Sequence, residues 1–205
     1  MNTKQKGKLI AFEGPEGAGK STQIKRLKDL LEAKGYTVIC TREPGGTPVG
    51  EQMRNLVLNE YVGIKSEILI FFASRLEHIS QVIKPAIERG DIVITDRFID
   101  SSYAYQGFGR EALPFVEAVD KLVMEGFEAD HTLYFSIPYE LMLDRMRQRG
   151  GGADRFEQEG QAFFTRVYEG YTRQSKLRRN VHVIDATQNI ENVTAQLSTW
   201  VNDNF

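Results

Sequence analysis

Short apolar segments alternate with longer amphipathic ones along the chain. Runs rich in β-branched and aromatic residues, typical of buried strands, occupy residues 8–14, 36–41, 91–96, 131–137 and 181–186. Residues 20–34, 50–58, 66–90, 113–126, 138–150, 160–179 and the C-terminal segment have helical composition or spacing. This alternation predicts an α/β fold with a five-stranded parallel sheet and helices on both faces. In the last helix, we expect Trp200 to pack in the core.

Composition adds few constraints. A chain of 205 residues with 41% hydrophobic residues predicts a single domain spanning residues 1–205. The net charge of −2 favours neither nucleic acid nor an anionic membrane as a partner. Cys40 is the single cysteine and is predicted to be a buried strand thiol in a reducing compartment. Because no signal-length apolar run follows the N-terminus, we expect a cytoplasmic protein.

The segment "FEGPEGAGKST" carries the strongest chemical signal. It fits G-x-x-x-x-G-K-[ST], with a strand predicted before it and a helix after it. Backbone N–H groups of such a loop bind phosphate, and the helix N-terminus adds positive charge. Lys20 is expected to reach the β- and γ-phosphates and Ser21 to bind Mg²⁺. The predicted ATP-binding residues are Gly14, Pro15, Glu16, Gly17, Ala18, Gly19, Lys20, Ser21 and Thr22.

A second cluster of polar residues, "TDRF", indicates which class of nucleotide-binding protein this is. The motif alone does not separate a kinase from a GTPase, a motor or a regulatory ATP-binding module, but no guanine-reading N-K-x-D occurs. Asp96 ends a predicted strand at the edge where ligands bind and is a second candidate for Mg²⁺. Arg97 suits a second phosphate, with a surface ion pair as the alternative. Two anion sites together indicate a nucleotide kinase.

The order of the motifs resembles bacterial thymidylate kinases. "TREPGGTPVGEQMR", "FFASRLEH", "TDRFIDSSYAYQG", "ADRFEQE" and "VIDATQ" follow the phosphate loop in the family's order. The resemblance implies a P-loop nucleoside monophosphate kinase fold and a homodimer. It also implies phosphorylation of dTMP to dTDP with ATP and Mg²⁺, for dTTP synthesis. Two alternatives remain: a kinase for another monophosphate such as dUMP, AMP or GMP, and a non-catalytic ATP-binding regulator.

The resemblance also implies the substrate-binding residues. Phe71 would stack on thymine, Arg75 would bond its O4 edge, and Tyr105 would disfavour a 2′-hydroxyl. Plain core packing is the alternative for Phe71, and a helix cap is the alternative for the neighbouring Ser101. The matching residues are Glu16 (at the 3′-hydroxyl), Glu43, Arg54, Phe71, Arg75, Arg97, Ser102, Tyr105 and Gln106. Asp185 resembles the residue beside the adenine.

The last expectation concerns a mobile lid over residues 145–158. Some family members carry an arginine just after the acidic residue of the phosphate loop, where this chain has Gly17. The missing charge would come from the lid, with Arg149 and Arg155 as catalytic residues beside Lys20 and Arg97. Arg145 shares a helix face with Arg149, whereas Arg147 does not. A solvated basic helix end is the alternative.

Overall fold

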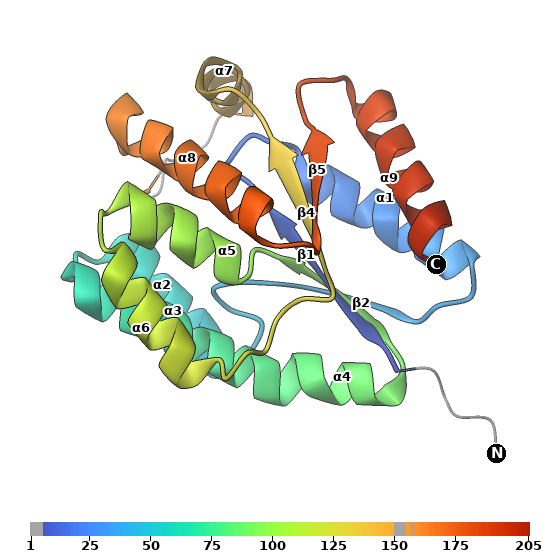
Figure 1. Cartoon of the computed structure of the whole chain (residues 1–205), viewed down its shortest axis with the longest axis horizontal. Helices are drawn as coiled ribbons and strands as arrows, with labels where there is room; N and C mark the ends of the chain where they lie inside the picture. Colours follow the sequence, from blue (N-terminus) through green and yellow to red (C-terminus); the bar gives the residue numbers. More distant parts are fainter. Residues whose placement is uncertain (1–5, 150–154, 157) are drawn as a thin grey trace.

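The computed structural model describes residues 6–149, 155, 156 and 158–205, and these residues form one parallel sheet covered by helices (Figure 1). The sheet order is β2-β3-β1-β4-β5. The predicted five-stranded α/β fold is confirmed. The strands are β1 (Lys8–Glu13), β2 (Val38–Arg42), β3 (Ile92–Asp96), β4 (His131–Ser136) and β5 (Val181–Asp185).

The helices largely follow the predicted segments, with one addition. Residues 99–109, where no element is predicted, form a short α-helix that continues as a π-helix. The α-helices are α1 (Lys20–Ala33), α2 (Pro48–Asn59), α3 (Ile64–His78), α4 (Lys84–Arg89), α5 (Ile99–Ser102), α6 (Leu113–Val123), α7 (Tyr139–Arg149), α8 (Gln161–Leu177) and α9 (Ile190–Asn204). The π-helices are η1 (Ile79–Ile83) and η2 (Tyr103–Gly109).

The predicted long helix over residues 66–90 is divided by a π-turn. α3 passes into η1 and then α4 without leaving helical backbone angles. Pro85, just after η1, has no N–H for the usual bond to the carbonyl four residues earlier, so the regular α-helical ladder cannot run through it.

Alternating residues of the strands supply two cores. On β1, Ile10 and Phe12 face one core, whereas Leu9 and Ala11 face the other. The first core lies against α1, α8 and α9, and the second against α3, α4 and α6. Because both faces are buried, the central strands are apolar throughout, as parallel strands in α/β proteins are.

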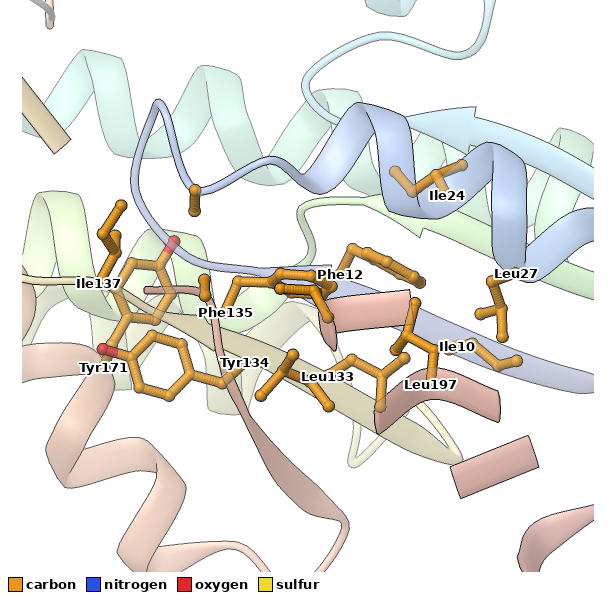
Figure 2. Close-up of a cluster of buried hydrophobic side chains, with 14 of the residues drawn as sticks. Ile10, Phe12, Ile24, Leu27, Leu133, Tyr134, Phe135, Ile137, Tyr171 and Leu197 are labelled. Carbon is orange, nitrogen blue, oxygen red and sulfur yellow. The ribbon is translucent and has the colours of Figure 1, made fainter. Parts of the chain in front are cut away.

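Aromatic pairs fill the first core at the carboxyl end of the sheet. Phe12 stacks on Phe135 with ring centroids 5.1 Å apart, and Tyr134 stacks on Tyr171 of α8 at 5.1 Å (Figure 2). Trp200 is 6% exposed, which confirms the prediction that it packs in the core. Stacked aromatic pairs of this kind add stability beyond their buried area.

Cys40 is exposed, so the prediction of a buried thiol was wrong. β2 lies at an edge of the sheet, and its residues alternate between buried or half-buried and exposed positions. An edge strand has a neighbour on one side only, so an apolar run does not guarantee burial there. The fully buried pattern holds for the inner strand β3, which has a neighbour on each side and where Ile92 to Thr95 are all buried.

The parallel register brings the chemical motifs to one edge of the sheet. Phe12 of β1 and Arg42 of β2 both pair with Asp96 of β3. The loops that follow these three strands therefore start side by side. None of the helices in the described residues has the length and apolar character needed to cross a lipid bilayer.

Candidate active site

The phosphate loop connects β1 to α1. Gly14 has φ of 135°, and a Cβ there would lie 2.6 Å from the Phe135 carbonyl oxygen, so only glycine fits. Gly19, also left-handed, precedes α1 and makes no side-chain cap. The first N–H groups of α1 are therefore not capped by that residue and suit an anion.

Lys20 lies inside the loop, as predicted for a phosphate-binding lysine. Its side chain is buried, and Nζ donates to the carbonyl oxygens of Gly14 (2.9 Å) and Pro15 (3.0 Å). Burial lowers the pKa of Lys20, and the charge of Arg97 lowers it further. The ammonium group thus lies next to two carbonyls that phosphate oxygens can replace as acceptors.

Asp96 and Ser21 fit a magnesium ion. Oδ1 of Asp96 is buried, accepts no hydrogen bond from the described residues, and lies 3.9 Å from Lys20 Nζ. Ser21 is the second residue of α1 and is exposed. Within the described residues, no group of three or more His, Cys, Asp or Glu could hold a metal. Mg²⁺ takes few protein ligands and completes its shell with water and phosphate, so the oxygens of Asp96 and Ser21 suit it.

Arg97 connects the phosphate loop to the neighbouring pocket. It follows β3 with φ of 73°, a backbone region that arginine rarely adopts. Its guanidinium donates to the Gly14 carbonyl oxygen (3.1 Å) and pairs with the Glu16 carboxylate. It also lies over the Tyr105 ring, 4.9 Å from the centroid. An ion pair with Glu16 is present, but it lies within the site and not on the surface.

Glu13 fixes this strained turn and was missed by the sequence analysis. Its carboxylate is 1% exposed and accepts from the backbone N–H groups of Phe98 (2.8 Å) and Ser101 (3.1 Å). It also accepts from the hydroxyls of Ser101 (2.5 Å) and Tyr171 (3.1 Å). Ser101 is therefore no helix cap. A carboxylate at the end of a buried strand, directly before Gly14, was the available signal.

Burial raises the pKa of Glu13 to about 7, and the nearby Asp100 raises it as well. The two backbone N–H groups can donate to Oε1 in either protonation state, and a protonated Oε2 can donate to the Ser101 or Tyr171 hydroxyl instead of accepting from it. Tyr171 and Ser101 also receive hydrogen bonds from Arg97, both at 3.1 Å. One buried network thus joins β1, the turn after β3, and α8.

A cavity of about 530 Å³, its open mouth included, lies beside the phosphate loop. All nine predicted substrate-binding residues line it, and so do Pro44, Leu58, Ser101 and Phe156. The nine are Glu16, Glu43, Arg54, Phe71, Arg75, Arg97, Ser102, Tyr105 and Gln106. Residues from α2, α3, η2 and the turns after β2 and β3 thus converge on one space.

Polar and aromatic groups divide the walls of this cavity. Phe71 is half-buried, and its ring lies 6.0 Å from that of Phe156, whereas Phe72 is 1% exposed and belongs to the core. Gln106 donates to Glu67 at 2.9 Å, and Arg54 donates to the Pro44 carbonyl oxygen at 3.0 Å. Aromatic rings beside hydrogen-bonding groups suit a nucleobase.

The arginines of the predicted lid lie in different places. Arg145 is half-buried, and its guanidinium lies 3.5 Å from the Gly17 carbonyl oxygen and 3.4 Å from that of Thr187. Arg147 is exposed. Arg155 pairs with Glu67 on the acceptor side and lies over the Phe156 ring.

The predicted lid includes residues that the structure does not describe. Residues 150–154, which include Gly150 to Gly152, lie outside the described residues, and so does the side chain of Arg149.

Asp185 lies at the end of β5 and accepts hydrogen bonds from Thr187, whose carbonyl oxygen is near Arg145. The loop predicted to lie beside the adenine is therefore close to α7.

A phosphate loop that shares Arg97 with a base-sized pocket defines a nucleoside monophosphate kinase site. The family model described as "Thymidylate kinase" matches residues 12–197. The chain belongs to the thymidylate kinase family, and it is a kinase.

Relatives cover nearly the whole chain. A thymidylate kinase of Thiobacillus denitrificans is 42% identical over 199 residues, covering 96% of this chain and 97% of the relative. Those of Nitrosomonas eutropha and Cupriavidus metallidurans are both 44% identical. They cover 92% and 94% of this chain and 89% and 96% of their own lengths.

The raised pKa of Glu13 predicts a pH effect on stability. Between the ordinary value of 4.5 and about 7, the folded protein keeps a proton that the unfolded chain releases. The stability contributed by that proton is therefore lost as the pH rises through this window. Glu13→Gln mimics the protonated carboxyl and does not titrate. The free energy of unfolding of this variant minus that of the wild type should therefore increase by on the order of 3 kcal/mol from pH 5 to pH 8.

Urea unfolding at several pH values measures this difference. Glu60→Gln, at an exposed position, is the control and should stay parallel to the wild type. A constant difference between Glu13→Gln and the wild type across the range would contradict the predicted titration.

Proposed function

We propose that this chain transfers the γ-phosphate of ATP to dTMP, giving dTDP and ADP. The observation that carries the proposal is the shared Arg97, which contacts the phosphate loop and lines the pocket that holds the nine residues predicted from the thymidylate kinase pattern. Donor and acceptor phosphates would meet at this guanidinium. Phosphoryl transfer requires mainly such alignment and charge compensation.

The donor side holds the triphosphate. The loop N–H groups and Lys20 bind its β- and γ-phosphates. Ser21 and Asp96 would hold Mg²⁺, which would supply positive charge for the transferring group. Arg145, beside the Gly17 carbonyl, adds positive charge over the loop. The acceptor is a phosphate that is already ionised at pH 7, so no general base is required.

The acceptor side orients the nucleotide. Phe71 lies against the base, and Arg75 has a buried Nη1 that donates to no acceptor of the described residues, which suits the O4 of thymine. Tyr105 occupies the position where a 2′-hydroxyl would come, and Glu16 receives the 3′-hydroxyl. Arg54 and Arg97 hold the acceptor phosphate. The exposed free thiol of Cys40 suits a reducing cytoplasm.

The assembly is a homodimer formed by α2 and α3. These helices pack together and expose large apolar side chains: Val49 and Leu56 on α2, and Leu69 and Leu76 on α3. Each pair is seven residues apart, so each lies on one face of its helix. An apolar strip across two adjacent helices suits a second copy of the chain.

Acceptor specificity tests the proposed reaction. Cytosine carries an amino group at position 4, which leaves the Arg75 donor unpaired, and an unpaired buried donor costs about 1–3 kcal/mol. In steady-state assays with ATP, kcat/KM for dTMP should exceed that for dCMP by at least ~10-fold. AMP, GMP and dUMP complete the panel.

Lys20→Met provides the control for this assay. Its far-UV dichroism should match the wild type while turnover falls by orders of magnitude, because charge compensation at the γ-phosphate is lost. A preference for a purine monophosphate would overturn the assignment of dTMP, and absence of ADP production with every acceptor would favour the regulator.

The lid arginines should act on the chemical step. Arg149→Ala and Arg155→Ala are expected to lower kcat strongly, with little change in the KM for dTMP, because arginines at a transferring phosphoryl group are worth ~10³-fold or more. For this, Arg155 must leave Glu67. Arg147→Ala is the control, since its side chain is exposed. A loss confined to the KM for dTMP would instead assign Arg155 to the acceptor pocket.

Sedimentation velocity tests the dimer. Leu69 is 52% exposed, and Leu69→Glu places a charge in the apolar strip, so it should shift the wild-type dimer to a monomer. The control is Leu177→Glu on α8, where Leu177 is 66% exposed on another helix. A monomeric wild type, or a Leu69→Glu variant that stays dimeric, would rule out this interface.

A further inference from the structure

A buried chain of polar side chains lies behind the wall of the acceptor pocket. Thr41 Oγ1 lies 2.7 Å from His78 Nε2, and His78 Nδ1 lies 2.9 Å from Glu43 Oε1. The other carboxylate oxygen of Glu43 accepts from Arg75 Nε at 2.7 Å. His78 is 0% exposed, Glu43 3% and Arg75 2%. Of these four residues, only Glu43 and Arg75 line the pocket.

The donors and acceptors fix the imidazole orientation. An ionised carboxylate only accepts hydrogen bonds, so Nδ1 of His78 carries a proton and donates to Glu43. In the neutral ring, Nε2 then accepts from the hydroxyl of Thr41. His78 is thereby held at both nitrogens, and it holds one oxygen of Glu43 while the other faces Arg75.

The guanidinium of Arg75 is held on all sides but one. Besides Nε, its Nη2 donates to the Phe98 carbonyl oxygen (2.9 Å) and to Ser102 Oγ (3.0 Å). The guanidinium carbon Cζ lies 5.1 Å from the Phe72 ring centroid and 5.5 Å from that of Phe98. Nη1 is buried and has no hydrogen-bond partner in the described residues. The geometry leaves this one nitrogen for a ligand.

The loop after β2 is shaped around the imidazole. Gly46 has φ of 79°, and a Cβ there would lie 2.6 Å from His78 Cδ2 and 2.8 Å from Thr41 Oγ1. Ser74, on the same helix as His78, accepts from the N–H of Gly45 at 3.1 Å. Any larger residue at position 46 would displace the histidine or the threonine. Gly46, the second glycine of "PGG", therefore leaves the space that the contact between His78 and Thr41 needs.

We propose that His78, supported by Thr41, is a positioning residue that sets base specificity. It holds Glu43, which holds Arg75, so that Nη1 points to a hydrogen-bond acceptor on the base. The inference rests on the proposed function and assigns the discrimination between a 4-oxo and a 4-amino pyrimidine to a residue that does not touch the substrate. Without His78, Arg75 keeps its bonds to Phe98 and Ser102, but Glu43 no longer holds Nε in a fixed place. Nη1 would then be aimed less precisely, and discrimination against dCMP would fall.

The test is the ratio of kcat/KM for dTMP to that for dCMP. His78→Leu removes both hydrogen bonds and should lower this ratio by about 10-fold, with the KM for ATP unchanged. Thr41→Val removes only the hydroxyl and should lower the ratio less. His78→Asn keeps a donor near the position of Nδ1 and should restore most of the ratio. His182→Gln, on β5, is the control and should leave the ratio unchanged.

The outcomes separate three cases. A folded His78→Leu with the wild-type ratio overturns the proposal, because a merely structural role would lower stability and activity on both substrates alike. If His78→Leu does not fold, the ratios of Thr41→Val and His78→Asn decide: the proposal fails if Thr41→Val matches the wild type. A wild type that does not prefer dTMP to dCMP refutes the proposed function itself, independently of His78.

Discussion

Two hydrogen bonds of Arg97, from its backbone N–H to the Phe12 carbonyl oxygen and from its guanidinium to the Gly14 carbonyl oxygen, are the constraint on which the site depends. β1 and β3 pair in parallel, with Phe12 opposite Asp96, so the residues that follow the two strands lie close together. Arg97 takes a left-handed backbone angle at this point, and its backbone N–H donates to the Phe12 carbonyl oxygen at 2.8 Å. Strained backbone persists where the surrounding structure over-determines it, and Glu13 supplies that support.

Three arginines of the site are each paired with a carboxylate. Arg97 pairs with Glu16, Arg75 with Glu43, and Arg155 with Glu67. These carboxylates keep several positive groups close together in a small volume before any phosphate arrives. Removing one partner of such a pair leaves a buried charge uncompensated, which costs more than an exposed pair would gain. The arginines are therefore largely positioned in advance, which lowers the cost of ordering them on binding.

Local signals predicted the strands and the phosphate loop well, whereas tertiary contacts decided the rest. A strand such as β3 is apolar at consecutive positions, and the loop motif lies within eight residues of sequence. Cys40 was placed wrongly because an edge strand and a central strand have similar composition. Tyr171 has no local signal, since its partner Glu13 is 158 residues away. Residues 99–109 resemble a loop, with two glycines, yet they are helical because α8 packs on them.

The hydroxyl of Tyr171 has a consequence for synthesis on the ribosome. The phosphate-loop motif is complete at residue 22, but the network that fixes Arg97 needs a side chain from α8, near the end of the chain. Contacts of such long sequence separation form late, because the entropy of closing the loop must be overcome first. A nascent chain therefore carries the motif long before it carries the finished site. The network around Arg97 is completed only after Tyr171 has emerged.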